Sequence, residues 1–164
     1  MPPDGGLRDR IIHESLYKAI ETQLTTLGWF DAGREHSDIV MVDEFPDEDA
    51  EVAFNTLAFS MGDGGGVPTE MGSPTTDEEI IFFVDFFAEN DAIGRHVRGD
   101  IFEFLKANPS QPVFDYSDIG DPEVFTVEVQ DDADKRKPDR AVNKWQKHWY
   151  VLSFSVIDYG RPHP

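Results

Sequence analysis

The chain of 164 residues contains no cysteine, so disulfide bonds and thiolate metal sites are both excluded. Basic residues are scarce, since 14 Lys and Arg stand against 33 Asp and Glu, for a net charge of −19. This excess of acid works against neutralising nucleic-acid phosphates and against docking on an anionic membrane. No apolar run approaches the roughly 20 residues of a membrane span, and the first residues lack the apolar core of a signal peptide. We therefore expect a soluble intracellular protein that does not contact a membrane.

The sequence also lacks motifs that are typical of catalytic, metal-binding or phosphate-binding sites. The five histidines form no His-x-x-x-His or His-x-His pair, so metal-ligand spacing is absent. No Gly-x-Ser-x-Gly motif supports a serine nucleophile. The Gly-rich segment 62–66 lacks the Lys-Ser/Thr pair of a phosphate-binding loop, and the acidic segment 43–51 lacks the register of an EF-hand. We expect no catalytic site, no metal and no cofactor, which makes an enzyme the least favoured class.

One strongly patterned stretch, Asp77–Ala107, organises the rest of the chain. Its first half alternates between apolar and mixed positions, the period of a strand packed on a core. The opposite, mixed face carries Ile81, Phe83 and Phe87, which we expect to be covered by a second helix or by a neighbouring subunit. Asn90 or Asp91 is expected to cap the helix that follows. The predicted buried face of the strand consists of Ile80, Phe82, Val84, Phe86 and Ala88.

The remaining segments predict one α+β domain spanning residues 1–164. Apolar residues three or four apart predict an amphipathic helix over Leu7–Leu27, stopped by Gly28, with Trp29 and Phe30 folding back onto the core. The sheet is expected to be mostly antiparallel or mixed, with about five strands and both helices packed on one face. The other strands are predicted in 37–45, 52–61, 123–130 and 145–159, the last two forming an antiparallel pair. A flexible tail (1–6), long loops (62–76 and 131–143) and a surface connection (108–122) complete the predicted chain.

Charge is unevenly placed along the sequence. Seven acids lie between Asp38 and Glu51, and six of the 14 basic residues lie between Lys135 and Lys147. An acidic patch on one surface and a basic patch on another suit heterologous head-to-tail contacts, which close into rings when the rotation permits. The alternative is two unrelated solvated loops. The candidate interface residues, including those of the Gly-rich segment and its neighbours, are Asp43, Glu44, Asp47, Glu48, Gly64, Gly65, Glu70, Met71, Lys135, Arg136, Lys137 and Arg140.

Four segments carry a resemblance to a known family. They are NTLAFSMGD (55–63), EMGS (70–73), FFVDFFAENDAIGRHVRGDI (82–101) and NKWQKHWYVLSFSVIDYG (143–160). Together with the N-terminal helix they resemble small tail-completion proteins, usually described as tail terminators, of long-tailed phages that infect actinobacteria. The charged segment 131–143 matches no element of that family. The motifs are structural patterns, so no residue-level function is carried over.

The resemblance implies a structural virion protein. It would form a homo-oligomer, a hexameric ring at the head-proximal end of the tail tube, assembled in the host cytoplasm and located at the tail–neck junction of the virion. Its partners would be the tail tube protein and the head–tail connector or stopper protein. Genomic DNA would pass through the lumen without specific binding, because carboxylates offer phosphates no neutralising contacts.

Two other functions compete with this one. The chain could be a connector or stopper protein of the neck, which would stay with capsids instead of tail tubes. A second class is an acidic DNA mimic that inhibits a nucleic-acid-binding enzyme, which rests on the net charge of −19 alone.

Overall fold

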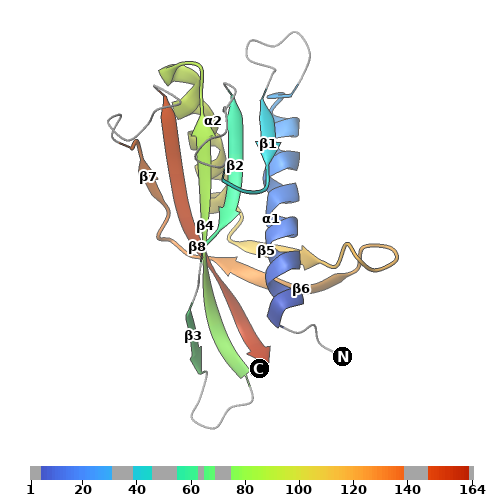
Figure 1. Ribbon diagram of the computed structural model, residues 1–164. Coiled ribbons are helices and arrows are strands. Elements are labelled where there is room, and N and C mark those ends of the chain that lie inside the picture. Colours follow the sequence, from blue (N-terminus) through green and yellow to red (C-terminus); the bar gives the residue numbers. More distant parts are fainter. Residues whose placement is uncertain are drawn as a thin grey trace.

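The computed structural model describes residues 5–30, 39–45, 55–62, 65–68, 75–138 and 148–162 (Figure 1). They form two helices and one curled, mixed sheet, which confirms a single α+β domain. The helices are α1 (Gly5–Thr26) and α2 (Asp91–Ala107). The strands are β1 (Val40–Val42), β2 (Thr56–Met61), β3 (Gly65–Pro68), β4 (Thr75–Phe87), β5 (Ser110–Phe114), β6 (Glu123–Val129), β7 (Asp134–Arg136) and β8 (Trp149–Pro162).

The sheet has eight strands in the order β1-β2-β4-β8-β6-β5, with β3 paired to β4 and β7 paired to β8. Among the described strands, β1 and β2 pair in parallel and every other pair is antiparallel. The predicted antiparallel pairing of the last two long strands is confirmed in β6 and β8, where Val129 faces Val156.

The prediction of about five strands was too low because β3, β5 and β7 lie in segments predicted as loops or as a connection. All three are short, with three to five residues, and carry no long apolar alternation. β3 and β7 form along β4 and β8, whose backbone groups need partners over 13 and 14 residues. Such short strands form because the neighbouring strand offers backbone groups for hydrogen bonding. Their own sequences carry little pattern that would predict a strand.

The core lies against the predicted face of β4. Phe82 is paired with Phe154 of β8, and Val84 with Leu152, and all four side chains are buried. The rings of Phe59, Phe82 and Phe154 stack with centroids 5.2 and 5.5 Å apart along this row. The alternation that predicted a buried strand is therefore confirmed, including Ile80, Phe86 and Ala88.

α1 contributes a buried stripe to the same core and ends where the sequence predicted. Gly28 has a φ of +80°, a left-handed conformation that glycine adopts without a Cβ penalty. The chain then turns back so that the amide of Trp29 donates to the carbonyl of Leu24 at 3.0 Å, and the indole of Trp29 is buried. At its other end α1 begins at Gly5, so the last two residues of the predicted N-terminal tail are helical. The stripe is Ile11, Ile12, Leu16, Ile20 and Leu24.

α2 begins at the predicted cap. The Asn90 side chain accepts a hydrogen bond from the amide of Ile93 at 3.0 Å. The two helices meet where the indole of Trp29 donates to Asp100 at 2.8 Å and packs edge-on against His96. The sheet is curled, and the predicted packing of both helices on one of its faces stays a prediction. Over the described ranges, neither helix is long and apolar enough to cross a membrane.

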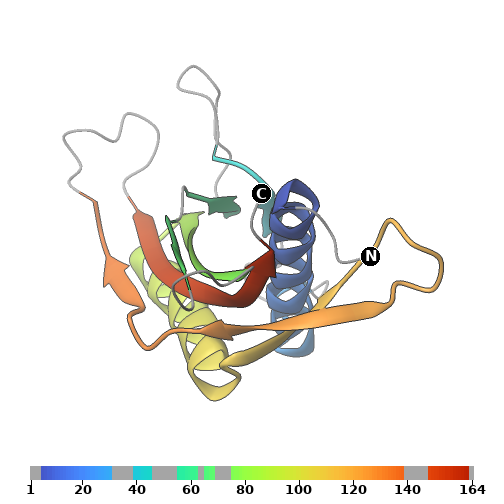
Figure 2. The same ribbon diagram turned by 90° about the horizontal axis from the view of Figure 1, so that it is seen from below.

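Two projections leave this body. One is the β5–β6 hairpin, which crosses α1 and extends to the side opposite β7 (Figure 2). The hairpin includes most of the segment 108–122, for which the sequence predicted a surface connection. The other, called the arm below, consists of β3 with the beginning of β4 and the end of β8 (Figure 1).

Candidate functional site

The structure separates the predicted interface residues. Asp43 and Glu44 are exposed just after β1, and Gly65 begins β3 in the arm. Lys135 and Arg136 lie in β7 and Lys137 directly follows it, all exposed. The segment 131–143 was predicted as a long loop, and its described part contains β7. The predictions for Asp47, Glu48, Gly64, Glu70, Met71 and Arg140 fall outside the described residues.

The basic segment is anchored to α2 by its own side chains. Lys135 Nζ lies 4.4 Å from the ring centroid of Phe102, a cation–π contact. The guanidinium of Arg98 donates to the carbonyl of Arg136 at 2.9 Å. Lys137 Nζ lies 3.0 Å from Asp91 Oδ1, at the start of α2. These contacts hold residues 135–137 against α2. The backbone that carries the three positive charges therefore has a fixed position on the surface.

Helix and strand together make a local basic surface on an acidic protein. Arg95 adds a second cation beside Asp91, at 2.8 Å. The pKa of the Asp91 carboxyl is lowered, mainly by the hydrogen bond from Lys137 and then by the charge of Arg95. Six of the chain's 14 basic residues gather on this surface. We call it the basic surface: Arg95, Arg98, Lys106, Lys135, Arg136 and Lys137.

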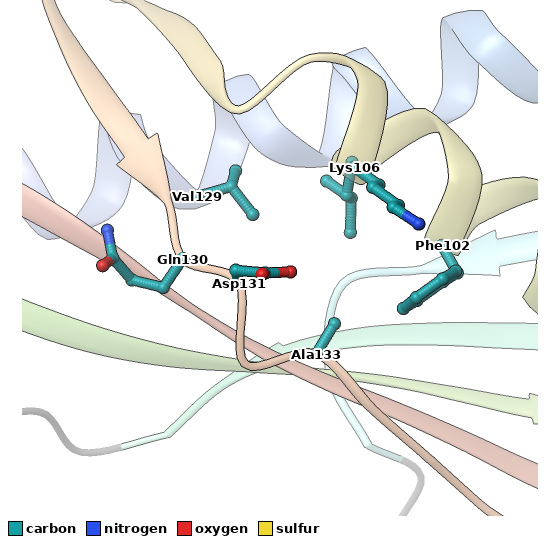
Figure 3. Close-up of a pocket in the computed structure, with 7 residues that line it drawn as sticks. Phe102, Lys106, Val129, Gln130, Asp131 and Ala133 are labelled. Atoms are coloured by element: carbon teal, nitrogen blue, oxygen red, sulfur yellow. The ribbon is translucent and has the colours of Figure 1, made fainter.

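A pocket opens at the end of the basic surface, between α2 and the link from β6 to β7 (Figure 3). Its volume is about 260 Å³. The walls are mainly apolar, with Lys106 and Asp131 as the charged side chains. Lys106 comes from the helix and Asp131 from the link, so the pocket has one charge of each sign at its wall. The lining residues are Phe102, Leu105, Lys106, Val129, Gln130, Asp131 and Ala133.

The tip of the β5–β6 hairpin, residues 115–122, is a second surface that the sequence reasoning missed. Ile119 is 99% exposed there, between acidic neighbours. The tip is closed by a hydrogen bond from the Asp115 amide to the carbonyl of Pro122 at 2.9 Å. The carboxylate of Asp115 also accepts from the amide of Ser117 at 3.0 Å, so the turn has a defined shape. The missed signal is a cluster of Asp, Ser, Gly and Pro flanked by alternating apolar residues, which is typical of a hairpin. Its acids are Asp115, Asp118 and Asp121, and Glu123 follows directly at the start of β6.

The mixed face of β4 is covered partly by the chain itself. Phe87 is fully buried, with its ring centroid 5.6 Å from Trp149 of β8 and 5.9 Å from Phe45. The expectation that a second helix or a neighbouring subunit covers Phe87 was therefore wrong, because the cover comes from the β8 neighbour and the segment after β1. Phe83 is half-buried, and Ile81 is 37% exposed.

Asp85 lies on this mixed face and is 5% exposed. Its carboxylate accepts a hydrogen bond from the indole of Trp149 at 2.9 Å. Burial raises the pKa of Asp85 to about 6, with the Trp149 hydrogen bond and the charge of Arg136 opposing the rise. The hydrogen bond joins Asp85 of β4 to Trp149 of β8, which indicates a structural role in linking the two strands.

A larger hollow of about 400 Å³ lies between α1 and β1 and includes the predicted interface residue Asp43. His13 and Tyr17 line it from the helix. The pKa of Tyr17 is raised mainly by burial and then by the charges of Glu21 and Asp43. No group of three or more His, Asp or Glu side chains in the described part of the chain is placed to hold a metal ion.

The chain matches no protein-family model and no curated protein sequence.

Proposed function

We propose that this chain is a structural virion protein that forms a ring at the head-proximal end of a phage tail tube. The ring would end tube polymerisation and offer the surface that joins the tail to the head connector. The proposal begins from the resemblance of the four sequence segments to tail-completion proteins.

The structural observation that carries the proposal is the placement of opposite charges at opposite ends of a small domain. The basic surface lies along α2 and β7, whereas the acidic hairpin tip projects from the other side (Figure 2). Two different, complementary surfaces favour heterologous contacts, and such contacts generate a ring when the rotation between neighbours closes.

The overall charge supports the same function. The net charge of −19 would give a ring an acidic character, even with a basic stripe on each subunit buried between neighbours. DNA passing through such a lumen would meet few phosphate-neutralising contacts and would slide without binding. In the proposed ring the tube protein and the connector would bind the two ends, with the arm and the segment after β1 as candidate contacts.

The test is electron microscopy of the purified protein mixed with tail tubes from a mutant that makes no heads. We expect rings at one end of each tube and none along its length. Decoration along the tube, or binding to isolated capsids in place of tubes, would contradict the terminator function, and the latter would favour a connector.

A charge reversal links this test to the basic surface. Arg136→Glu should reduce the ring population in native mass spectrometry, because the reversed side chain would repel an acidic neighbour. Arg10→Glu is the matched control, since Arg10 is exposed on α1 and pairs with Glu14 of its own helix at 3.0 Å. Equal loss of rings in the two variants would indicate an effect of net charge and would count against the basic surface.

A further inference from the structure

We infer that the hairpin tip of one copy docks into the pocket of the next copy, with the Ile119 side chain in the pocket between α2 and the β6–β7 link. The inference rests on the proposed ring and names the contact between its subunits. It is carried by an exposed apolar side chain, an apolar pocket, and charges that match around them.

The knob is Ile119, which is 99% exposed at the end of a hairpin with a defined shape. Gly120 and Asp121 follow it with φ values of +81° and +47°, and the amide of Asp121 donates to the carbonyl of Asp118. Because the backbone is closed by these hydrogen bonds, the Ile119 side chain is held away from the body. The Ile119 side chain, exposed to water on an ordered turn, does not stabilise the single copy. Burial of this side chain in a partner would be favourable.

The hole is the pocket of about 260 Å³, whose apolar walls include Phe102, Leu105, Val129 and Ala133. An apolar cavity of about 150 Å³ is large enough to hold benzene, so an isoleucine side chain fits in this volume. The pocket is open to the surface and lies between elements fixed by the core, since Leu105 and Val129 are both buried. It can therefore accept the knob without a rearrangement of the sheet.

The charges around knob and hole are complementary. Asp118 and Asp121 flank Ile119 in the sequence. Lys106 lines the pocket, and Lys135 sits beside it over the ring of Phe102. Asp131 is the opposing charge at the wall, and the nearby carboxylates of Asp132 and Asp134 are engaged by Ser155 and Arg136. The amines of Lys106 and Lys135 are therefore the charges available to the acidic tip. The positive charges of these two lysines favour an acidic partner over a neutral partner, and the hairpin tip is acidic.

We take the occupant to be a second copy because the chain itself offers a tip that matches the pocket in charge and apolar character, and this tip lies too far from the pocket of its own chain. The hairpin extends to one side of the domain, whereas α2 and β7, which border the pocket, lie on the other side (Figure 2). Each copy would offer one knob and one hole, so the contact repeats head to tail. A contact of one hairpin tip buries little surface, and we expect it to be weak between two free copies and strong only when several contacts close a ring or when a tube holds the copies together.

Cysteine pairs give a direct test, because the natural chain has no cysteine. One copy, the knob copy, carries Ile119→Cys, and the other, the pocket copy, is distinguished by a mass tag and carries Ala133→Cys. Under mild oxidation we expect at least about tenfold more mixed disulfide from this pair than from a control pair, because docked copies hold the two thiols at a high effective concentration. The control pair is Val40→Cys with Ala133→Cys, since Val40 is 54% exposed on β1 and takes no part in the proposed contact. Equal yields from the two pairs would overturn the inference.

A charge swap separates docking from a damaged turn. Asp118→Lys added to the knob copy should lower the mixed disulfide several-fold, and Lys106→Glu added to the pocket copy should do the same. Combining the two should restore most of the yield, because the ion pair is rebuilt with its signs exchanged. If the combination gives no recovery, the loss comes from each surface separately and the contact is wrong.

The contact and the proposed function can fail independently. Rings at tube ends without the specific disulfide would leave the terminator function standing and overturn the knob-and-pocket contact. A specific disulfide in a protein that ignores tail tubes would support the contact and contradict the terminator function. Preferential crosslinking of the knob copy to the tube protein would assign the hairpin to the tube and overturn docking between copies.

Discussion

Removing one partner of the buried ion pair between Arg8 and Asp158 should destabilise the fold strongly. Arg8 in the first turns of α1 donates from Nε to Asp158 Oδ2 at 2.9 Å and from its terminal nitrogen to Oδ1 at 2.5 Å. Asp158 in β8 is completely buried and Arg8 is 6% exposed. The guanidinium carbon also lies 3.7 Å from the ring centroid of Phe125 in β6. One side chain therefore joins the first helix to two strands, including the base of the hairpin.

Removing one partner of a buried ion pair typically costs about 3–5 kcal/mol, because the remaining charge loses its counter-ion away from water. Arg8→Met should be the more damaging change, because it removes both guanidinium hydrogen bonds to a completely buried carboxylate and also the contact with Phe125. Asp158→Asn keeps one acceptor for the guanidinium and should lie at the low end of that range. The double variant should lose less than the sum of the two, because it buries no unpaired charge.

The assay is urea unfolding followed by tryptophan fluorescence. With an m value of about 2 kcal/mol/M, the expected loss moves the midpoint down by about 1.5–2.5 M. Arg10→Met is the control, because Arg10 makes an exposed pair with Glu14 on the same helix and such pairs contribute about 0.3–0.5 kcal/mol. Two single variants that behave like the control, or a double variant that equals their sum, would refute the importance of the buried pair.

Two further predictions concern α2 and the mixed face of the sheet. Gly94→Ala should destabilise the fold, since the new Cβ would overlap the ring of buried Tyr150, whereas Gly99→Ala has open space and should stabilise the helix by up to about 1 kcal/mol. Thermal melting of the two variants checks this, and equal shifts of the same sign would contradict the close packing at Gly94. Burial raises the pKa of Asp85 from 3.8 to about 6. Between these two pH values the folded protein keeps a proton on Asp85 that the unfolded chain has released. The stability of the fold therefore decreases as pH rises from about 4 to above 6. Asp85→Asn keeps an acceptor for Trp149 and should therefore be more stable than the natural protein at pH 8, by about 3 kcal/mol, with the difference vanishing at pH 4. A constant difference between the two proteins across this range, measured by urea unfolding, would show that burial does not perturb Asp85.

The sequence predicted those parts of the fold whose signal is local. The apolar alternation around Phe82 identified the central strand, and Asn90 and Gly28 marked the start of one helix and the end of the other. Each of these rests on the conformational preference or period of a few adjacent residues. These local patterns can be recognised in the sequence without knowing which element packs against them.

The parts that escaped prediction depend on pairing between distant segments. Asp134–Arg136 reads as a charged loop, and it becomes a strand only because β8 extends beside it. In the candidate interface the sequence grouped Lys135 with Arg136, but it could not show that Arg98 and Arg95 of α2 join them. The pocket beside Lys106 and the exposed Ile119 likewise follow from how α2, β6 and the hairpin are placed in space.

The two long strands that form the arm also give the molecule a mechanical direction. β4 and β8 pair from Thr75 with Pro162 in the arm to Phe87 with Trp149 at the far end of the body. A pull between the arm and the far end would load the hydrogen bonds along this ladder in shear, so that many would have to break together. A pull that separates the two strands at the arm would open the same bonds one after another. Since forced unfolding is governed by the height of the unfolding barrier, the domain should resist tension along its long strands far better than peeling at its tip.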